Sequence, residues 1–199
     1  MREGSEGPAA NVPDRMNDYQ VIIAGGGMAG LACALFLARA QIEVGVFDQA
    51  QSSLRRVTRL WNYLGFPDGI GGQELLEISR RHAERFGAHV EDENITTVAR
   101  RDGSFFITTE TAELRSSFFV LASNKRTDLA TSLGLTLGGF GSKFVSVDSE
   151  GKTAVANCFA TGRITGLPSQ AIISAGDGAK VAIHLIQKIR GEYYVDHDT

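Results

Sequence analysis

The feature that most constrains this chain is a glycine-rich turn between an apolar strand and an apolar helix. Residues 19–24 (YQVIIA) form a short run rich in β-branched side chains, which is typical of a buried parallel strand. Three glycines at 25–27 end this run, and residues 28–40 (MAGLACALFLARA) are apolar almost all round, as a helix packed on a sheet is. Residues 42–47 (IEVGVF) predict a second strand. The sequence therefore predicts a βαβ unit, whose crossover is almost always right-handed.

The same turn has a spacing with a chemical meaning. Gly25, Gly27 and Gly30 form a G-x-G-x-x-G motif, and Asp48 directly follows the second predicted strand. The first glycine permits a tight turn, the second lets the backbone approach a pyrophosphate, and the third lets helix and strand pack closely. The helix N-terminus offers N–H groups to the phosphates, and Asp48 can accept hydrogen bonds from ribose hydroxyls. A bare glycine turn is the alternative, but strand, helix and terminal acid together favour a dinucleotide-binding site.

The remaining elements follow from local patterns. Residues 49–71 predict a long polar and aromatic loop, a kind of segment that is usually functional or disordered. Asp102-Gly103 is a hairpin signal, so residues 95–115 are expected to form a small antiparallel insertion. Apolar spacing predicts helical segments at 72–86, 126–133 and 169–190, and strands at 95–101, 104–109, 112–115, 117–122, 143–147 and 155–160.

Length and charge exclude several classes of protein. The 199 residues suffice for one domain with a substantial core. A formal net charge of −3 argues against a generic nucleic-acid binder, and no apolar run reaches the roughly 20 residues of a membrane-spanning helix. We expect a disordered tail at 1–17, one domain at 18–192 and a C-terminal tail at 193–199. The N-terminal segment lacks the apolar stretch of a secretory signal, so we expect a cytoplasmic protein.

Two separated parts of the sequence resemble the thioredoxin reductase family, in which both belong to the FAD domain. The first is similar to the family's ENYPGFPEGI…GPEL…AERFGA stretch, and the second to its VFAAGD…RQA…AAGDGA ending. The resemblance extends over nearly all of residues 19–190. The stretches that carry it read NYLGFPDGI at 62–70, EL at 74–75, ERFGA at 84–88, CFATGR at 158–163 and SQAIISAGDGA at 169–179.

This resemblance implies FAD as the cofactor and a role for each part of the site. The turn at 25–30 would hold the pyrophosphate, Asp48 the adenosine ribose, and the backbone near Val90 the adenine. Asn62 would contact the flavin side, and the helix from Ala171 would aim its N-terminus at flavin N1 and O2, which stabilises the reduced, anionic flavin. The implied cofactor-binding residues are Gly25, Gly26, Gly27, Met28, Ala29, Gly30, Asp48, Gln49, Asn62, Val90, Gly162, Arg163, Ser169, Gln170 and Ala171.

The chain also departs from the family. Only 37 residues, 124–160, separate the two parts, whereas a pyridine-nucleotide domain needs on the order of 100. The redox C-x-x-C of the family belongs to that missing domain. The family's ATG reads Ala122-Ser123-Asn124 here, and Arg163 replaces the acid of its GD pair. Arginine has donors only, so the hydrogen bond of that acid to a ribityl hydroxyl is lost or reversed, with the guanidinium at the cofactor or in solvent.

Other side chains offer little chemistry of their own. Cys33 and Cys158 lie in apolar segments, which favours buried thiols, with thiol exchange by Cys158 as the alternative. The four histidines show no metal-ligand spacing, so no metal site is expected. Trp61 and Tyr63 are interpreted as loop anchors, with shielding of the flavin as the alternative. Three loop arginines are interpreted as solvated charges, with contacts to FAD phosphates or to an acidic partner as the alternative: Arg55, Arg56 and Arg59.

We therefore expect an α/β fold, a three-layer Rossmann-like FAD-binding domain with a small antiparallel β insertion. The expected function is that of a flavoprotein oxidoreductase that passes electrons between an unknown donor and acceptor. No side chain is a credible catalytic group, so FAD carries the chemistry. A non-catalytic FAD-binding module and an NAD(P)-dependent oxidoreductase are the alternatives. The expected partners are a second copy in a homodimer or a separate electron-transfer protein, not nucleic acid or a membrane.

Overall fold

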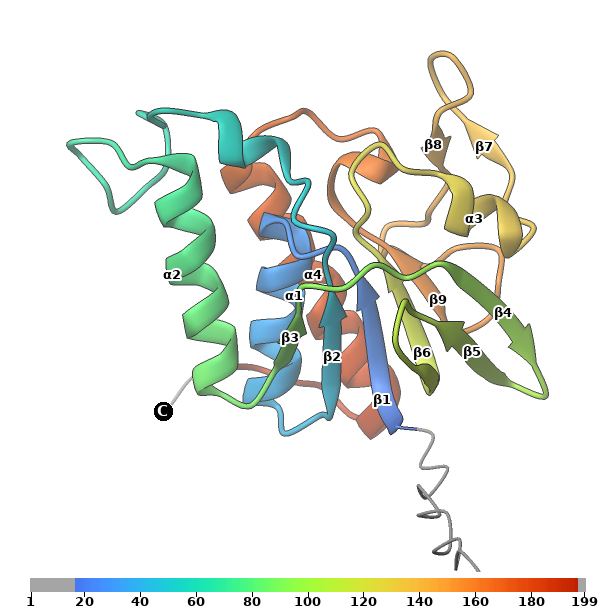
Figure 1. Ribbon diagram of the computed structural model, residues 1–199. Coiled ribbons are helices and arrows are strands. Elements are labelled where there is room, and N and C mark those ends of the chain that lie inside the picture. The colour runs from blue at the N-terminus through green and yellow to red at the C-terminus, as the bar shows by residue number, and fades with distance from the viewer. Residues whose placement is uncertain (1–16, 197–199) are drawn as a thin grey trace, which may run out of the picture.

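A seven-stranded sheet runs through the middle of the computed structural model, which describes residues 17–196 (Figure 1). Its main path has the order β3-β2-β1-β6-β5-β4, and β9 pairs with β6. The pairs of β1 with β2 and β6, of β2 with β3, and of β6 with β9 are parallel, whereas β4 and β5 form an antiparallel hairpin. The strands are Asn17–Ala24 (β1), Val44–Phe47 (β2), His89–Glu91 (β3), Thr97–Arg101 (β4), Ser104–Thr108 (β5), Glu113–Leu121 (β6) and Cys158–Ala160 (β9).

Strand β6 is continuous and has two different neighbours along one edge. Its first half pairs antiparallel with β5, and its second half pairs parallel with β9. The sequence predicted two strands instead, at 112–115 and 117–122, because serines interrupt the apolar run. That prediction is wrong, since Ser116 is buried within the strand and its Oγ donates a hydrogen bond to the carbonyl of Phe118. A polar side chain with a local acceptor does not break a strand.

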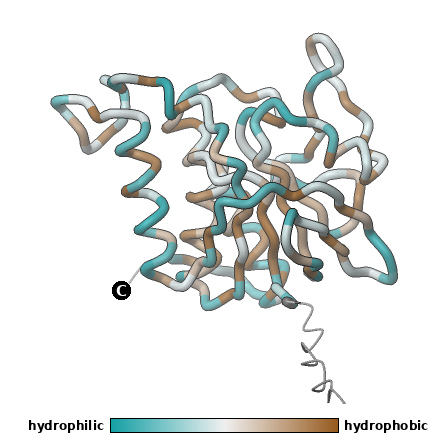
Figure 2. Tube along the Cα trace, viewed as in Figure 1, coloured by the Kyte–Doolittle hydropathy of each residue, from teal (hydrophilic) through white to brown (hydrophobic). Residues whose placement is uncertain are grey.

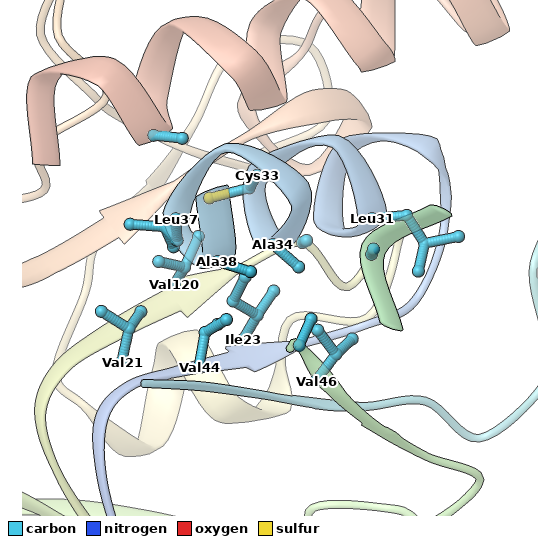
Figure 3. Close-up of a cluster of buried hydrophobic side chains, with 14 of the residues drawn as sticks. Val21, Ile23, Leu31, Cys33, Ala34, Leu37, Ala38, Val44, Val46 and Val120 are labelled. Atoms are coloured by element: carbon cyan, nitrogen blue, oxygen red, sulfur yellow. The ribbon is translucent and has the colours of Figure 1, made fainter. Parts of the chain in front are cut away.

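Three helices cover one face of the sheet: α1 (Met28–Arg39), α2 (Gly72–Arg85) and α4 (Ala171–Arg190). Helix α1 contacts both of the others and packs its apolar residues directly on β1, β2 and β6 (Figure 3). Burial of this apolar surface is the main favourable contribution to the packing. The fully buried residues of the contact are Val21, Ile23, Cys33, Ala34, Leu37, Val44, Val46 and Val120.

On the opposite face, side chains of the sheet, including those of the β4–β5 hairpin that extends it, form a second core with the short helix α3 (Asp128–Ser132) and the β7–β8 hairpin (Leu137–Gly138 and Phe144–Val145). Phe105 of β5 and Phe119 of β6 stack with ring centroids 5.7 Å apart in this second core. Hydrophobic residues gather on the central strands between the two coverings (Figure 2). The layers confirm the expected α/β class, and the antiparallel strands continue the main sheet from β6.

Several boundaries differ from the expectation. Strand β1 begins at Asn17, before the predicted residue 19, so Asn17 does not belong to a tail. The rest of the expected N-terminal tail, residues 1–16, lies outside the described residues, as do residues 197–199. Strand β7 was not predicted, because two residues are too few to show a period, whereas a strand start was expected at His89, where β3 begins. The loop at 49–71 contains a short 3₁₀ turn, η1 (Ser53–Arg56). No helix in the described part of the chain is long and apolar enough to cross a membrane.

A core substitution checks the packing of α1. We expect Leu37→Ala to lower the free energy of unfolding by about 2–5 kcal/mol, because a fully buried leucine leaves a cavity when it is truncated. Leu64 is 84% exposed, and Leu64→Ala is expected to change the same free energy by less than about 0.5 kcal/mol. Urea denaturation followed by circular dichroism measures both. Equal effects of the two substitutions would contradict the packing described here.

Candidate functional site

A cavity of about 370 Å³ opens where β1 turns into α1, and we call it the main cavity. Its size is within the usual range of small-molecule sites. It lies at the carboxyl end of β1, between the neighbouring strands β2 and β6, which is where open α/β sheets bind ligands. The predicted residues that line it are Gly25, Gly27, Met28, Ala29, Asp48, Gln49, Arg163, Ser169, Gln170 and Ala171.

The three glycines of the G-x-G-x-x-G motif differ in what a side chain at each position would contact. Gly25 has φ +114°, and a Cβ there would lie 2.5 Å from the carbonyl oxygen of Ala122. A Cβ at Gly30 would lie 1.9 Å from the carbonyl oxygen of Gly25, so α1 could not approach β1 as closely. Gly27 differs, because the nearest atom to a Cβ there is Ser52 Oγ at 3.8 Å. The space that a side chain at Gly27 would fill belongs to the main cavity.

Two helix N-termini meet at the main cavity. Gly27 is the N-cap of α1 and Gln170 the N-cap of α4, and neither helix has a side-chain cap or an acidic residue in its first turn. Their first N–H groups are therefore donors without an intrahelical partner. The positive ends of two helix dipoles favour an anionic ligand in the cavity between them. Helix α4 begins at Ala171, as the resemblance implied, two residues after the start at 169 that the apolar spacing predicted.

Asp48 lies between the main cavity and a second cavity of about 220 Å³. The second cavity is lined by the predicted residues Gly26 and Val90, and also by Arg55 and Arg80. The backbone N–H of Asp48 donates to the carbonyl of Glu91, at 3.0 Å, which ties the end of β2 to β3. The predicted residue set is therefore divided between two neighbouring cavities that share Asp48.

Three of the predicted cofactor-binding residues, Gly30, Asn62 and Gly162, line neither cavity. Asn62 Nδ2 donates to Gln170 Oε1 at 2.9 Å, which joins the loop before α2 to the N-cap of α4. Gly30 and Gly162 are buried behind the main cavity. Gly162 begins the short 3₁₀ turn η2 (Gly162–Thr165) with φ +74°.

The site also contains residues outside the predicted cofactor-binding set, although Ser123 and Asn124 were noted as departures from the family. The loop after β6 contributes Ser123, Asn124, Lys125 and Arg126 to the main cavity. Arg126 donates to the side chain of Asn94, which lines the cavity too, and pairs with Asp128 at 2.6 Å. The signal for these residues was present, because loops that follow the carboxyl ends of parallel strands lie at the ligand site.

Arg163 lines the main cavity, but its guanidinium turns toward the β7–β8 hairpin. Its Nη1 donates to the carbonyl of Leu167 at 3.0 Å, and its guanidinium carbon lies 5.0 Å from the ring centroid of Phe144 on β8. Its Nε is buried without a hydrogen-bond partner. The guanidinium therefore fastens η2 to the β7–β8 hairpin while the residue contributes to the cavity wall. That the guanidinium lies at the cofactor stays a prediction, whereas its buried Nε does not agree with a guanidinium in solvent.

Both cysteines are buried. Burial raises the pKa of the Cys158 thiol to about 12 and also raises the pKa of the Cys33 thiol, so both are protonated at neutral pH. This disfavours thiol exchange by Cys158.

Trp61 is 71% exposed and contacts Arg59, so it is not a buried anchor, whereas Tyr63 is partly buried beside Phe66. Residues 17–196 contain no group of three side chains suited to a metal ion.

The sequence matches the family of FAD dependent oxidoreductases over residues 20–135. The chain belongs to this family. The expected cofactor, FAD, is thereby confirmed in place of NAD(P), and so is the expected class of oxidoreductase.

Curated relatives of this FAD-dependent oxidoreductase are thioredoxin reductases. The thioredoxin reductase of Treponema pallidum is 36% identical over 110 residues, which are 53% of this chain and 35% of that protein. Mitochondrial thioredoxin reductase 1 of Arabidopsis thaliana is 28% identical over 191 residues, 91% of this chain and 49% of that protein. The chain spans about half or less of the length of these relatives.

Solved thioredoxin reductases share the fold of this oxidoreductase. The enzyme of Gloeobacter violaceus superposes with a TM-score of 0.81 at 17% identity, covering 92% of this chain and 98% of that one. The atypical enzyme of Desulfovibrio vulgaris Hildenborough gives a TM-score of 0.79 at 22% identity, covering 87% and 99%. Identities this low establish the likeness of the folds, and the resemblance to thioredoxin reductases is confirmed at that level.

The contrast between two motif glycines gives a test of the site. We expect Gly27→Val to fold normally, because its backbone is extended and the space beside it is open, but to raise the dissociation constant of FAD at least about tenfold. Gly30→Val is expected to destabilise the fold itself, because its side chain would meet the Gly25 carbonyl. Thermal unfolding without FAD and quenching of flavin fluorescence separate the two effects. Unchanged FAD affinity in Gly27→Val would contradict this site.

Proposed function

We propose that this oxidoreductase binds one FAD along the two cavities and passes electrons between a separate donor and a separate acceptor. The observation that carries the proposal is that two uncapped helix N-termini, at Gly27 and Gln170, face one cavity. Because Gly27 has no side chain, the space beside the first of these N-termini is open. This arrangement suits a long ligand with a doubly charged pyrophosphate in its middle.

The residues of both cavities fit the parts of FAD. Asp48 can accept hydrogen bonds from the adenosine ribose, with adenine in the second cavity near Val90. The N–H groups at the start of α1, from Met28 onward, hold the pyrophosphate. Ser169, Gln170 and Ala171 form the flavin end, which Asn62 orients through its hydrogen bond to Gln170; Arg163 closes the wall on that side.

Bound FAD supplies the redox chemistry, the uptake and release of electrons. The protein supplies binding and electrostatics. The N-terminus of α4, from Ala171, favours negative charge near it and so stabilises the reduced cofactor relative to the oxidised one. No acid or base on the chain is required for this role.

A separate electron donor and a separate acceptor are proposed because only a short segment joins β6 to β9. Between β6 and β9 the chain forms α3 and the β7–β8 hairpin, which lie within the short stretch at 122–157. This stretch contains neither a second nucleotide fingerprint nor a C-x-x-C. The activity of the thioredoxin reductases that the chain resembles therefore needs parts that these residues do not supply. A cytoplasmic location also stays a prediction.

The visible spectrum of the purified protein tests the proposal. We expect a yellow protein with the absorption bands of bound flavin, which a chemical reductant bleaches and an electron acceptor restores. A colourless protein without affinity for added FAD would refute FAD binding. A coloured protein whose flavin no reductant bleaches would instead favour the non-catalytic FAD-binding module, for which the two departures at Asn124 and Arg163 are the favouring observations.

The missing parts give a second expectation for activity. With NADPH as the only reductant, we expect no turnover of thioredoxin or of a small disulfide at enzyme-like rates. Slow oxidation of NADPH by collision with an exposed flavin is compatible with the proposal. Disulfide reduction assays with a complete thioredoxin reductase as the positive control measure this, and rapid turnover would show that the chain is self-sufficient.

A homodimer is also proposed. Trp61 and Leu64 on the loop before α2 and Phe140 between β7 and β8 are large exposed apolar side chains, and where such side chains gather in one patch a partner often covers them. Light scattering at micromolar concentration is expected to give twice the chain mass of 21.4 kDa. The mass of a single chain would count against the dimer.

A further inference from the structure

Helix α4 carries a carboxylate on its buried side that the proposed function leaves without a role. Asp177 Oδ2 accepts two hydrogen bonds of 2.7 Å, from Thr161 Oγ1 and from the backbone N–H of Gly162. Its other oxygen pairs with Lys180 at 2.9 Å, and the side chain is only 10% exposed. Burial raises the pKa of Asp177, but the hydrogen bonds from Lys180, Gly162 and Thr161 hold it below its ordinary value.

The two hydrogen bonds fix the turn that leaves β9. Thr161 is buried, and Gly162 has φ +74°, a conformation that other residues rarely adopt. One oxygen atom accepts both hydrogen bonds, so Asp177 ties the turn from β9 into η2 to helix α4. Without that acceptor, a backbone N–H and a hydroxyl would be left unpaired in the interior, which is costly.

The turn η2, helix α4 and helix α1 approach one another closely around Ala29. A Cβ at Gly162 would lie 2.7 Å from the Cβ of Ala29, and a Cβ at Gly178 would lie 2.1 Å from the Ala29 carbonyl oxygen. Ala29 belongs to the first turn of α1 and lines the main cavity. The turn η2, helix α4 and the N-terminus of α1 are therefore in direct contact around Ala29, and the Asp177 carboxylate holds η2 to α4 within this contact.

We propose that Asp177 is a positioning residue for the flavin half of FAD. It keeps η2 and the start of α4 in fixed register, so that the wall formed by Arg163, Gln170 and Ala171 is in place before the cofactor binds. A site that is ordered in advance binds more tightly, because less freedom is lost on binding. The inference rests on the proposed placement of FAD, with the flavin at η2 and α4 and the adenosine diphosphate part at α1 and Asp48.

Two ligands separate the halves of the site. FAD and ADP share the adenosine and two phosphates, and only FAD has the ribityl chain and the flavin. We expect Asp177→Ala to raise the dissociation constant of FAD about tenfold and that of ADP less than about twofold. Fluorescence quenching measures FAD, and isothermal titration calorimetry measures ADP.

Three matched variants define the role of the carboxylate. Asp177→Asn keeps an oxygen that can accept both hydrogen bonds, so its FAD affinity is expected to stay within about threefold of wild type. Lys180→Ala removes the exposed end of the ion pair and is expected to leave FAD and ADP affinities unchanged. Thr161→Val keeps the shape of the side chain but removes one hydrogen bond, and an FAD-specific loss of about threefold is expected.

The outcomes separate this inference from the proposed function. Equal losses of FAD and ADP affinity in Asp177→Ala would show a general structural role and overturn the proposal, and so would unchanged FAD affinity. Should Asp177→Ala fail to fold in thermal unfolding without FAD, Thr161→Val decides instead, and an unchanged FAD constant there overturns it. Failure of the wild-type protein to bind FAD counts against the proposed function itself.

Discussion

The close approach of α1 to the end of β1 is the contact on which the rest of the structure depends. A side chain at Gly30 would collide with the Gly25 carbonyl, and one at Gly178 would collide with the Ala29 carbonyl. Helix α1 is thus held between the β1 turn and α4 by backbone contacts that only glycine allows. Because α1 lies so deep in the helical layer, its N-terminus opens at the edge of the sheet, and the main cavity forms there.

The sequence predicted best those elements whose apolar pattern is long. Helices α1, α2 and α4 were recognised from apolar runs or apolar spacing over about twelve residues or more, and the glycine turn marked the βαβ unit. Short strands such as His89–Glu91 and Leu137–Gly138 have no period to read, because hydrogen bonds to neighbouring strands define them. The continuous β6 was split for the opposite reason, since Ser116 looks like an interruption until its acceptor, the Phe118 carbonyl, is known.

Some features of the candidate site were predictable from the sequence, and others were not. Gly25, Gly27 and Asp48 were predictable because their roles depend on backbone geometry at fixed spacings. The direction of Arg163 was not, because it depends on Phe144, which a separate hairpin brings to η2. The hydrogen bonds of Asp177 were likewise out of reach. An acid in a largely apolar helix is a signal, but which turn it holds is a tertiary fact.

The order of the strands along the chain has a consequence for how the molecule forms. The β1–α1–β2 unit is local, whereas α4 is joined to earlier parts of the chain by the hydrogen bonds of Gln170 with Asn62 and of Arg190 with Ala40, over 108 and 150 residues. Contacts of such separation are costly in loop-closure entropy and form late. During synthesis, the phosphate-binding turn therefore leaves the ribosome long before α4 does. The nascent chain has half a binding site for most of its synthesis, and the site is completed only when residues 158–190 dock.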